Sequence, residues 1–526
     1  MKRIFKITFV VLATTLFLGS CTKDLNTLPI DPRDMTSANV YQTIAGYKQV
    51  LAKTYAGLSV SGQQGAAGNP DISGIDEGFG EYLRAYWYHQ ELTTDEAVIG
   101  WNDQTIKDFH YQAWGSGDVF ISAMYYRIFF QISQCNEFIR ESSEAKLDER
   151  GFTGNDRAMI VKFRSEARFL RALSYYHALD LFGNVPFVTE NDPVGKFFPS
   201  QINRAALFTY VEKELLAIEP LLADARQNEY GRADKSAAWA LLAKLYLNAE
   251  VYASVNKYTE CLTYCNNIIN AGYTLSSEYK DIFLADNNIN PEIIFSINFD
   301  GLKTRTWGGT TFIIHAGVGG SMVPGDFGID GGWGGLRTTS AVVNKFSLLL
   351  DTRAMFWTDG QNLEIVDIGS FNDGYAVMKF KNKTSSGANG QDLTYPDTDF
   401  PMFRLADFYL MYAEAVKRGG SGGDEGTALN FVNEIRTRAY GNASGNIAAN
   451  QLTLDFILDE RARELYWECH RRTDLIRYGK FSTSDYVWPW KGGIAAGVST
   501  SSIYNIFPIP SSDVSANSNL KQNLGY

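Results

Sequence analysis

Apolar residues recur at three- and four-residue steps in three stretches of the chain, residues 163–183, 235–252 and 403–420. This spacing places them on one face of an α-helix. The second stretch is followed by the helix-like run "YTECLTYCNNIINAG", and the third, after a glycine-rich turn, by "TALNFVNEIRTRAYG". We therefore expect helical hairpins of tetratricopeptide size that stack on one another, with irregular hairpins lacking a true repeat as the alternative.

The periodic pattern disappears over residues 59–118 and 300–400, which are rich in glycine, asparagine, aspartate and aromatic residues. Their aromatic content argues against disorder, so we interpret them as long functional loops. The runs "EIIFSINFD" (292–300) and "GTTFIIHAG" (309–317) are predicted to form a pair of strands. In "DGGWGGLRTTS" (330–340), Trp333 lies between two pairs of glycines, where it is either a core plug or a binding surface.

These patterns predict a mostly α-helical protein, with a tetratricopeptide-like scaffold and a loop-rich, aromatic-rich ligand-binding subdomain that contains a little β-structure. A length of 526 residues favours more than one subdomain. The predicted divisions are a signal peptide (1–20), a tether (21–34), a helical scaffold with binding loops at 59–118 (35–299), a loop-rich subdomain (300–400) and a C-terminal helical hairpin with a closing segment (401–526).

The first twenty residues have three cations followed by an apolar run that is too short to span a membrane, which predicts a signal peptide. It ends in "LGSC", a pattern similar to the bacterial lipoprotein box, in which Cys21 is lipidated, for example with palmitate, and becomes the first residue. We expect the mature chain to contact the membrane through this lipid anchor alone. The alternative is a plain secretory signal with an incidental cysteine.

The formal net charge is −11, and loss of the signal peptide makes it −14. This acidity argues against a nucleic-acid partner. Four cysteines remain after Cys21, and the helical spacing of Cys261 and Cys265 disfavours a disulfide between them. We expect these four thiols to be buried and free.

Common catalytic motifs are absent from the sequence: there is no HExxH pattern, and no GxSxG, P-loop or GxGxxG fingerprint follows a predicted strand. The densest charge cluster, residues 457–481, contains Glu460, Glu464, Glu468 and Asp474, but arginines alternate with them at helical spacing. Such pairing lowers carboxylate pKa values, the wrong direction for the general acid of a glycosidase. We predict a salt-bridged helix, either solvated or between domains, and no enzymatic activity.

A calcium loop is the one cofactor site that the sequence suggests, and nothing in the sequence requires a cofactor. Asp286, Asn288 and Asn290 alternate as at the start of such a loop, but the glycine and the distal glutamate are missing, so a simple turn is the competing interpretation. Asp397 or Asp399 would complete a site only if the fold brings these segments together.

Several segments together resemble the SusD/RagB family: the lipoprotein start, "EARFLRALSYYHALDLFGNVPF", "GRADKSAAWALLAKLYLNA", "YPDTDFPMFRLADFYLMYAEA", "RARELYWECHRRTDLIRYGKF" and the terminal "FPIPSSDVSANSNLKQNLGY". The resemblance covers essentially the whole mature chain. It implies a non-catalytic lipoprotein on the cell-surface side of the outer membrane. Such a protein binds glycans or other nutrients and works with a TonB-dependent, SusC-like transporter.

The loops also resemble those of the starch-binding members of this family, which implies an α-1,4-glucan or maltooligosaccharide ligand. The implied glycan-binding residues are Asp76, Arg84, Trp101, Gln104, Trp307 and Trp333. Gln104 replaces an asparagine of the starch-binding pattern and Trp307 replaces a tyrosine, which keeps the chemistry but changes reach and ring size. The alternatives are a different glycan, a glycoside hydrolase or a scaffold that binds only proteins.

Overall fold

The computed structural model describes residues 37–347 and 349–526. The chain divides into two compact units, residues 1–47 and 48–526. In the first unit the described residues hold α2 (Ser37–Val40) and the start of α3 (Ile44–Ala56). The predicted signal peptide, Cys21 and the tether lie outside the described residues. Within the described residues, no helix has both the length and the apolar character needed to cross a membrane.

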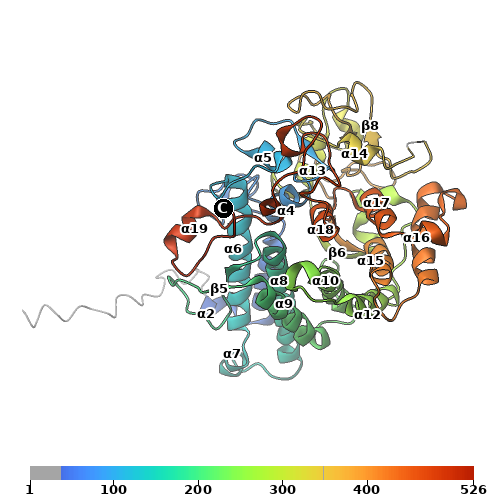
Figure 1. Ribbon diagram of the computed structural model, residues 1–526. Helices are drawn as coiled ribbons and strands as arrows, with labels where there is room; N and C mark the ends of the chain where they lie inside the picture. Colours follow the sequence, from blue (N-terminus) through green and yellow to red (C-terminus); the bar gives the residue numbers. More distant parts are fainter. Residues whose placement is uncertain (1–36, 348) are drawn as a thin grey trace, which may run out of the picture. The chain divides into compact units, whose positions relative to one another are not determined.

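Paired helices form the framework of the second unit (Figure 1). Consecutive members of two series pack on one another: α6 (Val119–Glu141), α8 (Gly154–Leu181) and α9 (Arg204–Ile218), then α10 (Lys235–Leu247), α12 (Tyr258–Ile269), α15 (Leu405–Lys417) and α16 (Glu425–Tyr440). The prediction of a mostly helical, tetratricopeptide-like fold is confirmed. Small buried residues on α10, such as Ala240 and Ala243, allow this close packing.

The helix ends follow local capping chemistry more closely than the apolar pattern. Helix α10 begins after Asp234, whose carboxylate accepts hydrogen bonds from the backbone N–H groups of Ser236 and Ala237 at 2.8 and 3.2 Å. It stops at Asn248, so the predicted helix over 235–252 is two helices, α10 and α11 (Ala249–Ala253). Helix α8 starts at Gly154, nine residues before the predicted start at 163. Its first turns are polar and mostly exposed, so they lack the apolar period on which the prediction rests.

Shorter helices complete the second unit. They are α4 (Tyr82–Gln90), α5 (Ile106–Tyr111), α7 (Glu144–Glu149), α13 (Gly309–Gly317), α14 (Ser340–Val343), α17 (Leu454–Leu465), α18 (Arg471–Arg477) and α19 (Ser511–Ala516). Short 3₁₀ turns are η2 (Glu219–Leu221), η3 (Tyr279–Phe283), η4 (Asn287–Ile289), η5 (Pro324–Phe327), η6 (Ala443–Gly445), η7 (Ala449–Gln451), η8 (Lys491–Gly493) and η9 (Ser502–Asn505).

The β-structure consists of antiparallel pairs. The longest joins β6 (Ile293–Ile297) to β10 (Phe400–Arg404), with Phe400 opposite Ile297. The others are two-residue strands: β1 (Gly62–Gln63) with β2 (Asn69–Pro70), β3 (Val98–Ile99) with β7 (Leu336–Arg337), β4 (Val185–Pro186) with β5 (Gln201–Ile202), and β8 (Phe356–Trp357) with β9 (Ala376–Val377). The predicted helix over 403–420 therefore begins only at Leu405, where β10 ends.

The predicted strand at 309–317 is wrong, because these residues form helix α13. Every residue of α13 is buried, so its apolar run has no exposed face to reveal a helical period. Phe312 packs edge-on against Trp87 and Tyr88 of α4, at ring-centroid distances of 5.5 and 5.2 Å. The true partner of β6, strand β10, follows about a hundred residues later, and periodicity carries no information about such a pairing.

The predicted single helix over 457–481 is two helices, α17 and α18, joined by a turn at 466–470, and most of its charges are buried instead of solvated. Arg353, fully buried, donates to Glu460 and Glu464 at 2.8 and 3.0 Å. Arg404 at the end of β10 donates to Glu464 and Glu468, both at 2.6 Å. We call the connected set the buried ion network: Glu292, Asp351, Arg353, Lys379, Arg404, Arg436, Arg438, Glu460, Arg463, Glu464 and Glu468.

The buried ion network ties the loop-rich region to the C-terminal segment, because Arg353 pairs with Glu460 of α17 and Lys379 pairs with Glu468 in the turn between α17 and α18. Burial by itself raises the pKa of Glu464, but Arg438, Arg404 and Arg353 outweigh burial and hold that pKa below its ordinary value. The cysteine prediction is confirmed, since Cys135, Cys261, Cys265 and Cys469 are buried and free.

Candidate functional site

Four aromatic rings from separate loops lie in sequence along one surface of the second unit. The ring centroids of Trp101 and Trp333 are 6.3 Å apart, those of Trp333 and Trp307 are 6.1 Å apart, and those of Trp307 and Tyr395 are 5.3 Å apart. The corresponding interplanar angles are 45°, 59° and 46°. All four residues are partly exposed. We call these four residues the aromatic arc.

A short strand pair brings the first two rings together. β3 ends two residues before Trp101, and β7 begins three residues after Trp333. Their antiparallel pairing continues as a hydrogen bond from Gly100 N to Gly335 O at 2.9 Å. The Trp101 indole N–H then donates to the backbone carbonyl of Trp333 at 3.3 Å. The pairing of β3 with β7 thus determines which two loops share this surface.

The glycines around Trp333 allow the loop to pack closely. A Cβ atom on Gly335 would lie 2.5 Å from the Trp101 ring, closer than any side chain tolerates. Gly334 adopts φ +56°, in the left-handed region that glycine favours. The backbone N–H groups of Gly334 and Gly335 donate to the carbonyls of Val318 and Ala316, both at 2.9 Å. Trp333 is therefore held on a loop that is hydrogen-bonded to the C-terminal end of α13.

His315 supports Trp333 from behind. Its imidazole stacks on the indole with a centroid distance of 4.8 Å and an interplanar angle of 25°. The two ring nitrogens face backbone carbonyls, Nδ1 that of Gly331 at 2.6 Å and Nε2 that of Thr394 at 3.0 Å. These contacts fix the plane of the imidazole and also link the Trp333 loop to the loop that carries Tyr395.

Arg84, in the first turn of α4, supports the other end of the arc. Its guanidinium donates from Nη1 to the backbone carbonyl of Trp307 at 2.8 Å and from Nε to the Tyr88 hydroxyl at 2.8 Å. It also lies 4.4 Å from the centre of the Phe312 ring, a cation–π contact. The Glu81 carboxylate caps the start of α4 and the start of α13, because it accepts hydrogen bonds from Arg84 N and from Gly309 N, each at 2.7 Å.

Asp76 is an exposed residue of the loop that precedes α4. Its Oδ1 atom accepts hydrogen bonds from the backbone N–H groups of Gly78 and Phe79 at 2.8 and 3.0 Å. A Cβ atom added to Gly78 would lie within 3.1–3.3 Å of Asp76 Oδ1, Arg84 Nη1 and Trp307 Cβ. Three predicted site residues therefore converge on the space above this glycine.

Gln104 is exposed and lines a separate groove beside the arc.

The predicted calcium residues serve as loop caps instead. Asp286 accepts from the Ser385 backbone N–H and hydroxyl, and Asp397 accepts from Gly301 N and Gln391 N.

Asn288 is exposed, and within the described residues Asp286 and Asp397 share no hydrogen-bond partner. The described part of the chain holds no group of three or more His, Cys, Asp or Glu side chains arranged for a metal ion. The turn interpretation therefore accounts for the Asp286 segment.

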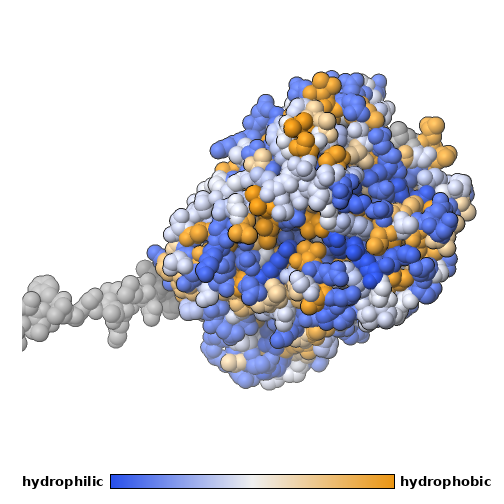
Figure 2. Space-filling model, viewed as in Figure 1, coloured by the Kyte–Doolittle hydropathy of each residue, from blue (hydrophilic) through white to orange (hydrophobic). Residues whose placement is uncertain are grey.

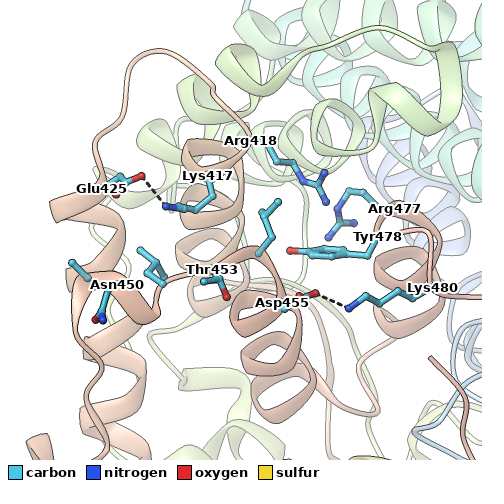
Figure 3. Close-up of a pocket in the computed structure, with 12 residues that line it drawn as sticks. Lys417, Arg418, Glu425, Asn450, Thr453, Asp455, Arg477, Tyr478 and Lys480 are labelled. Atoms are coloured by element: carbon cyan, nitrogen blue, oxygen red, sulfur yellow. Dashed lines mark hydrogen bonds and ion pairs between the residues drawn. The ribbon is translucent and has the colours of Figure 1, made fainter. Parts of the chain in front are cut away.

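A cavity of about 810 Å³ lies elsewhere, among α15, α16, α17 and α18 (Figure 3). Its charges are already paired: Lys417 with Glu425 at 2.8 Å, and Lys480 with Asp455 at 2.6 Å. Tyr478 is the one aromatic residue in its lining. This cavity offers no series of ring faces, so the aromatic arc is the better candidate site.

Sequence reasoning identified the three tryptophans but not Tyr395, Phe312 or His315. Tyr395 precedes a proline in the loop before β10, and its position as a loop aromatic was the available signal. Phe312 and His315 lie in the run that was predicted as a strand, and the helix turns both toward the back of the arc. Only the helical form of this segment reveals their role.

A family model described as "SusD family" matches residues 350–526, and another, "Starch-binding associating with outer membrane", matches residues 80–247. The starch-binding protein SusD of Bacteroides thetaiotaomicron is 35% identical, with 96% of each chain covered. The chain belongs to the SusD family. SusD-like protein P25 of Formosa agariphila is a more distant relative, 28% identical over 61% of this chain and 64% of its own.

Solved structures of the SusD superfamily share the fold. A member from Parabacteroides distasonis superposes with a TM-score of 0.71 at 23% identity, covering 94% of this chain and 100% of its own. Surface glycan-binding protein A of B. thetaiotaomicron, solved with laminarihexaose, gives 0.69 at 22% identity, covering 91% and 99%. The SusD-family scaffold is thus present over nearly the whole chain.

Proposed function

We propose that this SusD-family protein binds an α-1,4-glucan, such as starch or a maltooligosaccharide, on the aromatic arc. The observation that carries the proposal is the series of partly exposed rings at Trp101, Trp333, Trp307 and Tyr395. A glucose ring has an apolar C–H face that complements an aromatic ring. Each such contact contributes about 1.5–2.5 kcal/mol at ~25 cal/mol per Å² of buried apolar surface.

The inclination of successive rings supports a curved ligand. Neighbouring rings are tilted by 45–59° to one another, whereas a flat β-1,4 chain stacks on rings that lie nearly in one plane. Asp76 and Arg84 lie beside Trp307 and supply charged partners for sugar hydroxyls. Ordering a flexible oligosaccharide offsets much of the gross gain, so we expect an affinity in the micromolar to millimolar range.

The relatives support the cellular context of the proposal. SusD of B. thetaiotaomicron is named as a starch-binding protein, and one matching family model is described as associating with the outer membrane. We accordingly propose a lipoprotein anchored through Cys21 at the outer membrane that delivers glucan to a TonB-dependent, SusC-like transporter. A catalytic role is disfavoured because the glutamates of α17 are buried against arginines, which removes them as a carboxylate pair.

Affinity electrophoresis with amylopectin tests the proposal. We expect amylopectin to retard the wild-type protein and to release no reducing sugar. Trp333→Ala should lose most of the retardation. Trp357→Ala is the matched control, since Trp357 is also partly exposed but lies on strand β8 outside the arc, and its indole N–H donates to Ser321 Oγ and Asp359 O, each at 3.0 Å.

Laminarin in a parallel gel separates glucan classes, because a β-1,3-glucan is the ligand in the laminarihexaose complex of a structural neighbour. Retardation by laminarin but not by amylopectin would replace the α-1,4 assignment and keep the arc as the site. Equal retardation of Trp333→Ala and wild-type protein by amylopectin would refute the site itself.

A further inference from the structure

A groove of about 460 Å³ lies next to the aromatic arc, outside the ring series. Its lining comes from four parts of the second unit: the 74–79 loop, residues 103–104 before α5, the start of α6, and α19. The lining residues are Gly74, Ile75, Phe79, Asp103, Gln104, Val119, Phe120, Ser122, Tyr126 and Ser512. Figure 1 shows α5, α6 and α19 on the same side of this unit.

The lining combines an apolar wall with polar groups. Phe79 and Phe120 pack with centroids 4.8 Å apart at 62°, and Val119 and Ile75 extend this apolar wall. On the polar side, the Tyr126 hydroxyl lies 2.9 Å from Ser512 Oγ. An apolar wall beside hydroxyl and amide groups suits the C–H faces and hydroxyls of a saccharide.

Gln104 has an amide available for a ligand. No hydrogen bond of its side chain to any described residue is present, and the side chain is exposed. Asp103 is the only lining residue with a formal charge, and it is exposed as well. One carboxylate and no cation in the lining disfavour acidic or sulfated saccharides and favour a neutral one.

The groove is continuous with the arc through two segments. Gln104 follows Trp101 by three residues, a backbone span of about 11 Å at most. The 74–79 loop borders both the arc and the groove. Asp76 lies close to Arg84 and Trp307 around Gly78. Ile75 and Phe79 of the same loop line the groove. A chain leaving the arc at Trp101 therefore reaches Gln104 and the groove directly.

We propose that this groove is a second subsite for the same neutral glucan, one that holds sugar residues beyond those stacked on the aromatic arc. The inference rests on the proposed function. Gln104 then serves at the junction, where its free amide binds hydroxyls of the sugar that passes from arc to groove. The consequence is discrimination by chain length: a ligand that fills only the arc gains nothing from the groove, and a longer ligand does.

Calorimetric titration with maltotriose and maltoheptaose tests this subsite. We expect wild-type protein to bind maltoheptaose about tenfold more tightly than maltotriose, equivalent to ~1.4 kcal/mol. Ser122→Tyr places a ring in the groove and should abolish the difference while maltotriose binding stays unchanged. Ser512→Tyr narrows the groove from α19, a different helix, so the subsite is tested even if the Ser122 substitution disturbs α6.

Ser133→Tyr is the matched control on the same helix. Ser122 and Ser133 both lie on α6, and each hydroxyl donates to the carbonyl four residues earlier, that of Asp118 or Phe129, at 2.8 Å. Ser133 is exposed and lies outside the groove, so its tyrosine variant should keep the wild-type preference.

Two results would overturn the inference in distinguishable ways. Equal affinity of wild-type protein for the two chain lengths, or a full preference for maltoheptaose in both Ser122→Tyr and Ser512→Tyr, refutes the subsite alone. Absence of binding to either oligosaccharide refutes the proposed function and the subsite together.

Discussion

The buried ion network and the aromatic arc use their side chains in opposite ways. In the network, Arg404 and its glutamate partners are at most 1% exposed, and the charges are directed at one another. In the arc, Trp101, Trp307 and Trp333 retain partly exposed faces although their edges and backbones are fixed by hydrogen bonds and ring contacts. The densest charge in the chain therefore serves architecture, and the apolar rings supply the candidate recognition surface.

Exposed apolar side chains occur in many parts of the chain, the loop-rich region included. Figure 2 shows hydrophobic residues on the surface over the part of the second unit that contains α14 and β8, and exposed apolar side chains of the 320–393 loops include Val323, Val366 and Leu393. Scattered exposed apolar residues are ordinary on a protein surface. The arc differs from them because its rings are aligned and supported from behind by His315 and Arg84.

Breaking the buried ion network should give the largest effect on stability. Arg404→Met leaves Glu292, Glu464 and Glu468 without a shared guanidinium, and removal of one buried partner costs about 3–5 kcal/mol. Urea unfolding measures this loss. Arg157→Met is the control, because Arg157 pairs with exposed carboxylates and its loss should change the free energy of unfolding far less. Similar losses of unfolding free energy for the two variants would show that the buried ion pairs contribute no more to stability than the exposed ones.

Asp399 differs from the carboxylates of the buried ion network, because no cation within the described residues pairs with it. Burial raises the pKa of Asp399 to about 7, and its side chain accepts from Phe299 N and contacts the Tyr230 hydroxyl. Because the folded-state pKa is raised, its contribution to stability is complete below the unfolded pKa of about 3.9 and is lost as pH rises toward 7.

Asp399→Asn keeps the neutral form at every pH. We expect the free energy of unfolding of the variant, relative to wild type, to increase between pH 5 and pH 8, as followed by urea unfolding at each pH. A constant difference across that range would show that Asp399 is ionised in the folded protein at pH 5 already.

The smallest predicted change concerns one methyl group in the Trp333 loop. Gly335→Ala forces the Trp101 ring to move, because the new Cβ would lie 2.5 Å from it, and should weaken amylopectin binding about tenfold. Gly331→Ala is the control in the same loop, since no atom lies within 4 Å of its added Cβ. Equal amylopectin binding by the two variants would mean that the position of the Trp101 ring does not affect binding.

Prediction from sequence succeeded where polar residues interrupt an apolar run at helical spacing. The stretches at 163–183 and 235–252 were predicted as helices because residues such as Arg168 and Lys244 interrupt their apolar runs, although most of both stretches is buried. It failed at 309–317, where α13 is buried on all sides and its short apolar run contains no charged residue. At 457–481 the predicted pairing of arginines with carboxylates is confirmed, but most of these charges are buried, so the solvated alternative is wrong. In both cases the result depended on which elements pack against each face of the segment, and local sequence does not contain that information.

The sequence by itself determined the helical framework, the free buried cysteines, the family and the loop tryptophans, because these follow from local periodicity, residue chemistry and resemblance. Only the tertiary structure decided that Trp333 is neither a core plug nor an isolated ring. The pairing of β3 with β7 places it beside Trp101, and His315 and Tyr395 arrive from loops far away in the chain. Contacts between residues distant in sequence are set by packing, which no local pattern specifies.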